Sequence, residues 1–543
     1  TFHRIEPEAL TAPLSRAQSM IWIGEQRDPG TPVFNTAWWF ELPDAPDPER
    51  FQQALITVVD SCDALRLIVT HDTSGHPVQT DTGCMAGRHE FCVLPSEAAA
   101  VDWMAHVVRR PFEPGRETFH SALIQLPGNK AIWYFNQHHV VTDAWSSSLI
   151  FAALDKAYSG AVPDALPSFL DHAAAEPGHV DETNAAFWNA TTLSEAPVPR
   201  LYGQASRPGE TASAMPTIDL GEERSFRLNT LLSQKGFGAL SRAQAHFNLF
   251  ATVVAVWMAR VTGEDRVPLG VVSHGRQTPT ARRTAGCFIE LFPMVLDLPS
   301  KASFRGAHRH VTERGFDLLR RATPGTSTTH GLSRFNAVVN VVPARFGKWQ
   351  GQPVTAHWLD TGAIDPHHAF RMNVLDPADG DSLSLALAFN KGVFDEGRRD
   401  AATRHILAIL DAFLDDPDQL IEEVPLFDDG DASAALVRQD PFLDPEPIKD
   451  VLAAFEDSVA AGETEVSVVC GDVSLSRRTL MRRMDALALA LRHQGIEPGD
   501  RVGLYLTRSV DLVAACLAVL KIGATFVPLD PGQTARRLSV IRD

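Results

Sequence analysis

Short apolar runs alternate along the chain with longer segments of helical periodicity, which is the pattern of a mixed α/β protein. Residues 36–42 and 131–136 are apolar and aromatic enough to form buried strands. Residues 49–62 and 146–158 follow them with the apolar spacing of amphipathic helices. A longer, mostly apolar helix is predicted over residues 237–261. Together these elements predict an α/β (α+β) fold with an extensive core.

Shifts in composition divide the chain into larger parts. Residues 196–216 are rich in proline, glycine, serine and alanine, and we expect them to cross from an N-terminal lobe to a C-terminal lobe. The lobes then cover about residues 1–195 and 217–427. Residues 428–447 are acidic and contain proline, which is typical of an interdomain linker. Residues 448–543 remain as a second unit.

Net charge and composition narrow the classes of function. The chain has 543 residues and a formal net charge of -18, which argues against a nucleic-acid surface of clustered Lys and Arg. Hydrophobic residues make up 44% and charged residues 21%, as in globular proteins with a large core. No apolar run reaches membrane-spanning length, and the six cysteines lack Cys-x-x-Cys spacing. We therefore expect a cytoplasmic protein with buried, reduced thiols, no zinc site and no membrane contact.

The strongest chemical signal is a pair of adjacent histidines followed by an aspartate, on a predicted strand-to-helix connection. Adjacent residues of an extended chain point to opposite sides, so only one of His138 and His139 can face a substrate. Histidine takes and returns a proton near neutral pH, as an amine attacking an acyl carbonyl requires. We predict an acyl-transfer centre of His139, His138 and Asp143, with Asp143 as an orienting or structural carboxylate. The alternative is a chance pair of core histidines followed by a helix-capping aspartate.

This run is similar to the His-His-x-x-x-Asp-Gly motif of the condensation domains of nonribosomal peptide synthetases, with Ala144 in place of the glycine. Further segments resemble motifs of the same family, in the same order. They are residues 13–22, 62–66, 286–293, 330–336 and 388–395. Two of them depart from the family: Ser61 and Cys62 replace an Arg-His pair, and Glu290 and Leu291 replace an Asn-Thr pair.

The resemblance covers about residues 10–427 and implies a two-lobed, chloramphenicol-acetyltransferase-like condensation fold. It implies peptide-bond formation between two substrates, each held as a thioester on the phosphopantetheine arm of a donor or acceptor carrier domain. It assigns His139 to the acceptor amine and pairs Asp143 with Arg276 in a structural salt bridge. Four residues would line the substrate channel: Ala144, Trp145, Ser146 and Ser333. No cofactor or metal would be bound directly, because the carriers supply the phosphopantetheine.

A second resemblance follows the predicted linker. Residues 474–480 and 520–530 are similar to the first two motifs of adenylation domains. Between them, residues 501–506 and 509–520 predict a strand and a helix that begin a βαβ unit. No Ser/Thr-Gly-rich phosphate loop follows. We expect this truncated α/β adenylation subdomain to be inactive alone and to require the rest of the adenylation domain as its partner.

Several alternatives stay open. Residues 273–276 and 283–286 have features of epimerisation-type relatives, although a condensation-like domain directly before an adenylation domain argues against them. A degenerate domain that gates or recruits another enzyme is motivated by Ala144, by Glu290 and by the missing Arg-His pair. An ester-forming relative is a further alternative. A second histidine pair, His367-His368, has no carboxylate at the motif spacing, and we interpret it as a loop or a channel lining.

Overall fold

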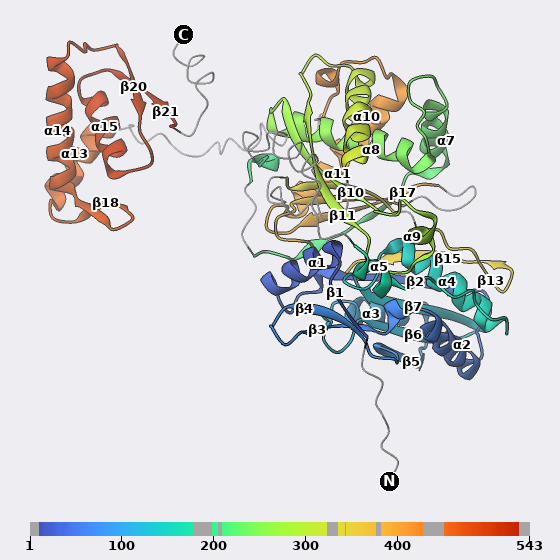
Figure 1. Ribbon diagram of the computed structural model, residues 1–543. Helices are drawn as coiled ribbons and strands as arrows, with labels where there is room; N and C mark the ends of the chain where they lie inside the picture. Colours follow the sequence, from blue (N-terminus) through green and yellow to red (C-terminus); the bar gives the residue numbers. More distant parts are fainter. Residues whose placement is uncertain are drawn as a thin grey trace. The chain divides into compact units, whose positions relative to one another are not determined.

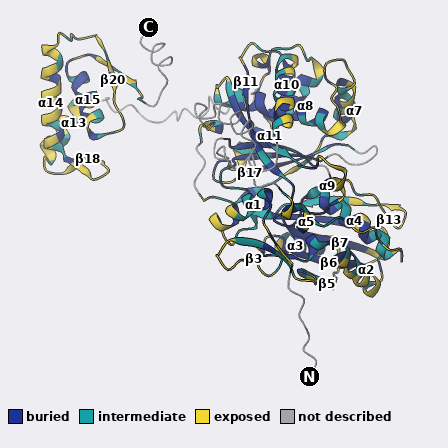
Figure 2. Cartoon of the chain, in the orientation of Figure 1, coloured by how far each residue is buried: buried dark blue, intermediate teal, exposed yellow. Residues whose placement is uncertain are grey.

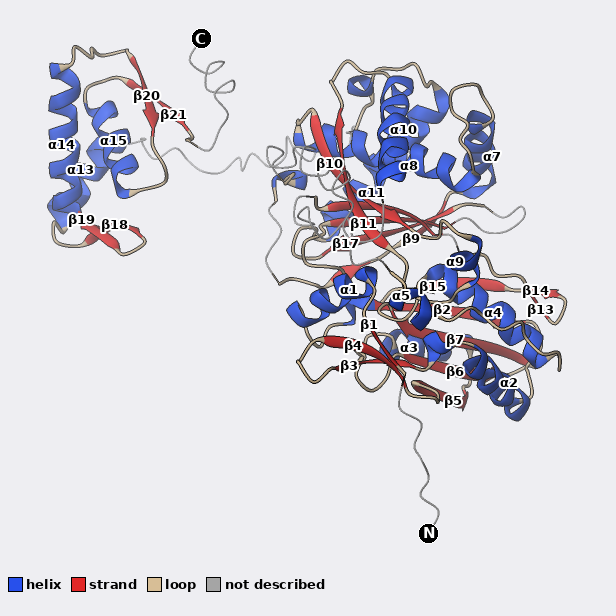
Figure 3. Cartoon of the chain, viewed as in Figure 1, coloured by secondary structure: helices blue, strands red, loops and turns tan. Residues whose placement is uncertain are grey.

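The computed structural model describes residues 10–176, 198–204, 209–322, 335–342, 344–375, 382–426 and 450–531. The chain forms two compact units, Thr1–Asp428 and Asp429–Asp543 (Figure 1). Ser333 and the predicted linker at 428–447 lie outside the described residues. Helices and strands occur together in both units, so the predicted mixed α/β class is confirmed (Figure 3).

The first lobe of the first unit is built on a five-stranded sheet with the order β15-β2-β7-β6-β5. The strands are β2 (Asn35–Leu42), β5 (Gly87–Val93), β6 (Phe119–Leu126), β7 (Lys130–His138) and β15 (Thr355–Leu359). Trp133 and its neighbours on one face pack with helices α2 (Pro48–Ser61) and α4 (Ala144–Tyr158). Tyr134 on the other face packs with α3 (Glu97–Val107). Aromatic residues that alternate along β7 therefore fill both sides of this sheet.

Strand β15 lies far along the chain but belongs to the sheet of the first lobe. It pairs antiparallel with β2, with Thr355 opposite Glu41 and Leu359 opposite Ala37. The predicted boundaries place this segment in the C-terminal lobe, because hydrophobic patterning does not show which sheet a short strand joins. The crossing ties the two lobes of the first unit together.

A three-stranded sheet, β1-β4-β3, and two helices complete the first lobe. They are β1 (Thr11–Pro13), α1 (Arg16–Arg27), β3 (Leu67–His71), β4 (Pro77–Asp81) and α5 (Phe169–Ala174). A capping box starts α1, in which the side chains of Ser15 and Gln18 each accept a hydrogen bond from the other's backbone N–H. The buried amide of Gln18 also donates to the Val140 carbonyl at 2.9 Å. This bond holds α1 against the turn that follows β7.

The second lobe is a seven-stranded sheet with the order β11-β10-β12-β16-β17-β8, and β9 also pairs with β17. Its strands are β8 (Ser213–Ala214), β9 (Thr217–Asp219), β10 (Arg266–Ser273), β11 (Glu290–Asp297), β12 (Ala337–Val342), β16 (Phe370–Leu375) and β17 (Ser384–Asn390). Its helices are α7 (Gly221–Leu232), α8 (Arg242–Thr262), α9 (Pro279–Arg283), α10 (Phe304–Arg321) and α11 (Glu396–Asp415). Buried residues concentrate where helices and strands meet (Figure 2).

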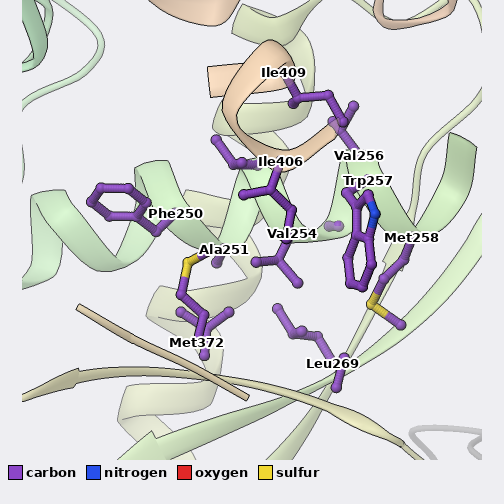
Figure 4. Close-up of a cluster of buried hydrophobic side chains, with 14 of the residues drawn as sticks. Phe250, Ala251, Val254, Val256, Trp257, Met258, Leu269, Met372, Ile406 and Ile409 are labelled. Carbon is purple, nitrogen blue, oxygen red and sulfur yellow. The ribbon is translucent and has the colours of Figure 1, made fainter. Parts of the chain in front are cut away.

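Helix α8 is the core helix of the second lobe. It begins at Arg242, after the capping side chain of Ser241, and not at residue 237 as predicted. Gly236 and Gly238 favour a non-helical approach to this cap. The helix is long and apolar enough to cross a membrane, but 72% of its most apolar 18-residue stretch is buried inside the lobe. Figure 4 shows Val254 and Trp257 of α8 between Ile406 of α11 and two residues of the sheet, Met372 and Leu269.

The second unit contains the predicted βαβ element. Strands β20 (Arg501–Tyr505) and β21 (Thr525–Leu529) pair in parallel, and α15 (Val510–Lys521) connects them. The remaining elements are α13 (Val451–Ala461), the hairpin β18 (Val466–Cys470) and β19 (Val473–Ser476), and α14 (Arg477–His493). Two thiols differ from the prediction of buried cysteines, because Cys470 here and Cys84 in the first unit are exposed.

Candidate active site

The two adjacent histidines lie where β7 ends. The backbone N–H of His138 donates to the Thr118 carbonyl at 2.7 Å, and that of His139 donates to the Phe34 carbonyl at 2.8 Å. Phe34 ends a short 3-10 helix at Pro32–Phe34. Because successive residues are bound to neighbours on different elements, the two imidazole rings have different surroundings.

The His138 ring is packed inside the first lobe. It is 2% exposed and lies near the rings of Phe34 and Phe112. The Val140 N–H donates to its Nδ1 at 3.1 Å, so the neutral ring carries its proton on Nε2. Nε2 faces a Glu25 carboxylate oxygen at 3.4 Å. Both nitrogens of His138 are thus directed at groups of the protein.

One nitrogen of the His139 ring, Nε2, has no hydrogen-bond partner among the residues that the structure describes. Its Nδ1 donates to the Thr142 carbonyl at 2.8 Å, because a carbonyl oxygen can only accept. Nε2 of the neutral ring therefore carries the lone pair. Burial lowers the pKa of His139 below its ordinary value, and the bond to Thr142 and the charge of Asp143 oppose this only in part. His139 is therefore neutral at pH 7, with a basic nitrogen free to accept a proton.

Asp143 is a buried carboxylate that joins the two lobes. It caps α4 by accepting from the Ser146 N–H at 2.8 Å. Both of its oxygens accept from Nη2 of Arg276, at 2.8 and 2.9 Å, and Asp143 is 1% exposed. The Phe288 N–H donates to one oxygen at 3.3 Å. Both carboxylate oxygens are therefore engaged by groups of the second lobe.

Arg276 is positioned by the loop that follows β10. Its Nη1 donates to the carbonyls of Ala281 and Thr284. The guanidinium lies over the ring of Phe288, 4.1 Å from the centroid. The preceding Gly275 has φ +59°, and a Cβ there would meet the Phe288 carbonyl oxygen at 2.5 Å. Glycine at 275 therefore lets the arginine reach the carboxylate.

The predicted channel residues have differing positions. Ser146 is fully buried, and its hydroxyl bonds with Asp143 and with the backbone of Gly286, so it belongs to the ion-pair network. Trp145 is partly exposed and donates to the Arg282 carbonyl of the second lobe at 2.9 Å. Ala144 is the first residue of α4, has a negative φ and packs beside the core of the first lobe. Its replacement of glycine therefore causes no backbone strain.

A cavity of ≈ 120 Å³ is lined in part by Phe34, whose carbonyl accepts the hydrogen bond of the His139 N–H. Its wall is formed by α1, the 3-10 helix, the start of β11 and the turn at 365–368, and is mostly apolar. Phe34, Glu290, His367 and His368 are among the lining residues. The second histidine pair thus lies on a cavity wall. Among the described residues, no group of three His, Cys, Asp or Glu side chains could hold a metal ion.

Two functional neighbours of the histidines were not identified from the sequence. Glu25 faces His138, and Phe34 both supports His139 and lines the cavity. A usable signal exists for Glu25. It lies seven residues, or two helical turns, after Gln18, so both polar side chains occupy one face of α1. Both are buried, and buried polar residues on one helix face indicate a polar site beneath it.

Comparison with protein families agrees with this geometry. The sequence model of the Condensation domain family matches residues 8–436, and that of the AMP-binding enzyme family matches residues 455–543. The dimodular nonribosomal peptide synthase of Bacillus subtilis (strain 168) is 25% identical over 97% of this chain, which covers 23% of that protein. The isonitrile lipopeptide synthase of Streptomyces coeruleorubidus is 25% identical over 98% of this chain, which covers 37% of it. The chain thus spans well under half of either relative.

Solved structures resemble the fold. A mutant of the starter condensation domain of rhizomide synthetase, in complex with C8-CoA, has a TM-score of 0.67 and 22% identity, and the match covers 77% of this chain and 98% of that chain. The four-domain nonribosomal peptide synthetase AB3403 has a TM-score of 0.65 and 19% identity, over 100% of this chain and 43% of that chain. The predicted two-lobed condensation fold is confirmed. Since the family match spans most of the sequence, the protein belongs to the condensation domain family, with a segment of an AMP-binding enzyme after it.

Proposed function

We propose that the first unit is the condensation domain of a nonribosomal peptide synthetase and forms an amide bond between two carrier-tethered substrates. One observation carries the proposal. His139 is held by its Nδ1–H on the Thr142 carbonyl, so a basic Nε2 remains for the acceptor amine. Burial lowers the pKa of this ring, which keeps it neutral near pH 7.

The proposed reaction is acyl transfer from a thioester to an amine. The amine nitrogen attacks the thioester carbonyl carbon, a C–N bond forms, and the carbonyl π pair moves onto oxygen. His139 Nε2 accepts the proton that the nitrogen loses. The tetrahedral intermediate then collapses, the C–S bond breaks, and the thiolate of the donor arm takes the proton from His139. Tethering both substrates replaces diffusion by a high effective concentration.

The partners follow from this reaction. A donor and an acceptor carrier domain would each deliver a substrate on phosphopantetheine, so the domain itself binds no cofactor. Residues 455–543 match the AMP-binding enzyme family, and no Ser/Thr-Gly-rich phosphate loop occurs in them. We propose that these residues do not adenylate an amino acid by themselves and act with the rest of an adenylation domain.

The alternatives are less well supported. A degenerate, gating domain was motivated partly by Ala144, whose backbone is unstrained. The buried pair of Asp143 and Arg276 is complete, and His139 keeps a usable nitrogen, so the features that a condensation centre needs are present. An epimerisation-type domain is disfavoured because an AMP-binding segment follows directly. Ester formation would use the same geometry with a hydroxyl in place of the amine.

The test is acyl transfer between two carriers. The 543-residue chain is incubated with a donor carrier and an acceptor carrier, loaded with a panel of acyl groups and with the common amino acids. Intact-protein mass spectrometry is expected to show the donor acyl mass moving to the acceptor arm, as a base-stable amide. If no pair in the panel gives transfer above the rate without the chain, the proposal fails. A base-labile product on a hydroxyl would identify ester formation instead.

A further inference from the structure

Arg371 is a cation on the wall of the second lobe that faces the first lobe. It lies in β16, where Phe370, Met372 and Val374 point into the core beneath α8. Side chains alternate along a strand, so Arg371 points to the opposite face. Leu375, on the same face as Arg371, packs against the core of the first lobe. Arg371 therefore lies on the face of the sheet that is turned toward the first lobe.

The guanidinium of Arg371 is only partly satisfied. Its Nη2 is 3.3 Å from Nδ1 of His368, and its Nε is buried without a hydrogen-bond partner in the part of the chain that the structure describes. Its register partners on the neighbouring strands, Val338 and Ala388, have no polar side-chain atoms. Among the residues that the structure describes, Asp365 is the carboxylate that acts on the pKa of Arg371, and it forms an ion pair with Arg27 at 3.6 Å. Arg276, by contrast, is neutralised by both oxygens of its aspartate.

His368 holds Arg371 without neutralising it. Burial lowers the pKa of His368 to about 4, so the ring is neutral and its Nδ1 accepts from the guanidinium. Arg371 is half-buried, and a partly buried positive charge without a carboxylate hydrogen-bonded to it is unfavourable in the free protein. An oxygen that becomes negative beside the guanidinium would relieve this cost.

Arg371 is also within electrostatic range of His139. His368 lines the ≈ 120 Å³ cavity together with Phe34, whose carbonyl binds the His139 N–H. The positive charge of Arg371 is near enough to lower the pKa of His139. The other charged or titratable groups that act on His139 are Asp143, which raises its pKa, and His138, which lowers it.

We propose that Arg371 is a catalytic residue of the condensation reaction, whose guanidinium donates hydrogen bonds to the donor carbonyl oxygen as that oxygen becomes negative. This inference rests on the proposed function. When the amine attacks, the π pair of the C=O bond moves to the oxygen, and Arg371 stabilises the charge without giving up a proton. Collapse returns the pair to the C=O bond, the C–S bond breaks, and the leaving thiolate receives the proton held by His139.

The test compares Arg371→Met and Arg371→Lys with the matched control Arg266→Met. Arg266 begins β10 in the same sheet, with a side chain 40% exposed and directed away from the core. With donors that carry no charge, the rate constant kcat of Arg371→Met is expected to fall by about 10²–10³, the loss typical of one oxyanion-stabilising donor. The Lys variant should lose less of this rate than the Met variant. The control Arg266→Met should match the unmodified chain in rate and in melting temperature.

The pH profile separates this role from a structural one. Without the positive charge, the pKa of His139 rises, so the acid limb of kcat/KM moves to higher pH in Arg371→Met and stays in place in Arg371→Lys. Unchanged kcat in both variants, or a loss confined to KM for donors that bear a carboxylate, would overturn the proposal. If the unmodified chain transfers no acyl group at all, the proposed function itself fails. If the Met variant unfolds, the Lys variant is the test. Its rate must then lie below that of the unmodified chain.

Discussion

At the residue scale, the two adjacent histidines differ in which nitrogen carries the proton. His138 directs Nε2–H toward Glu25, whereas His139 directs Nδ1–H toward the Thr142 carbonyl. The side-chain alternation of an extended chain predicted that only one ring faces the substrate. It did not predict the tautomers, because these depend on Val140, Thr142 and a residue more than a hundred positions away.

The protonation of His139 leads to a prediction about pH. Burial lowers its pKa below the ordinary value of about 6.5. Only the neutral ring accepts the amine proton, so kcat/KM should rise with pH through a pKa below about 6.5 and be level from there to neutral pH. The measurement is kcat/KM for carrier-to-carrier transfer across this range, with substrates that do not titrate in it. An acid limb centred above about 7 would contradict the environment assigned to this ring.

The buried ion pair leads to a prediction about stability. Asp143→Ala or Arg276→Ala leaves one buried charge without its partner, so each should lower the free energy of unfolding by roughly 3–5 kcal/mol. The double variant should lose much less than the sum, because it leaves neither charge alone. Denaturant unfolding of the single and double variants measures this coupling. Additive losses would mean that the two residues do not stabilise each other.

The pair of Asp143 and Arg276 shows which features of the site the sequence could predict. Arg276 was selected by resemblance to a family motif, and the structure brings it to Asp143 across 133 positions of sequence. Ser146 was expected on the channel wall, but its hydroxyl completes this buried network. Spacing alone could not distinguish the two positions, because the channel wall and the network both adjoin the first turn of α4.

At the scale of elements, local patterns predicted several helices and strands, and contacts distant in sequence decided how others pair. Strand β7 and helix α4 were predicted within two residues, because their apolar periods are regular. Helix α8 starts later than predicted, because the Ser241 side chain caps its N-terminus and the residues directly before Ser241 are not helical. The pairing of β15 with β2 joins residues more than three hundred positions apart, and no local pattern carries that information.

Helix α4 also explains why Ala144 is compatible with the site. The family motif has glycine at this position, which would be required only if φ were positive, and Ala144 has helical backbone angles. The cap that orients this helix is Asp143, the residue that also binds Arg276. One carboxylate thus fixes both the start of α4 and the contact between the lobes, four residues after His139.

At the scale of the whole molecule, the activity of each unit can be tested separately. The second unit has its own core, with Met484, Ala518 and Val519 buried between two helices. Its residues lack a phosphate loop, so the 543-residue chain should neither bind ATP tightly nor exchange pyrophosphate with any of the common amino acids. Calorimetry with ATP and a pyrophosphate-exchange assay check this. Robust exchange would show that residues 450–531 and their neighbours form a complete nucleotide site.

The central claim for the whole molecule is that His139 performs proton transfer in carrier-to-carrier condensation. The most direct test is the single-turnover rate of acyl transfer by His139→Ala, measured beside the control His76→Ala, whose side chain is 77% exposed in the turn between β3 and β4. We predict a rate lower by about 10²–10⁴ for His139→Ala, with an unchanged melting temperature, and no loss for the control. Transfer by His139→Ala at the rate of the unmodified chain, with the fold intact, would contradict the account.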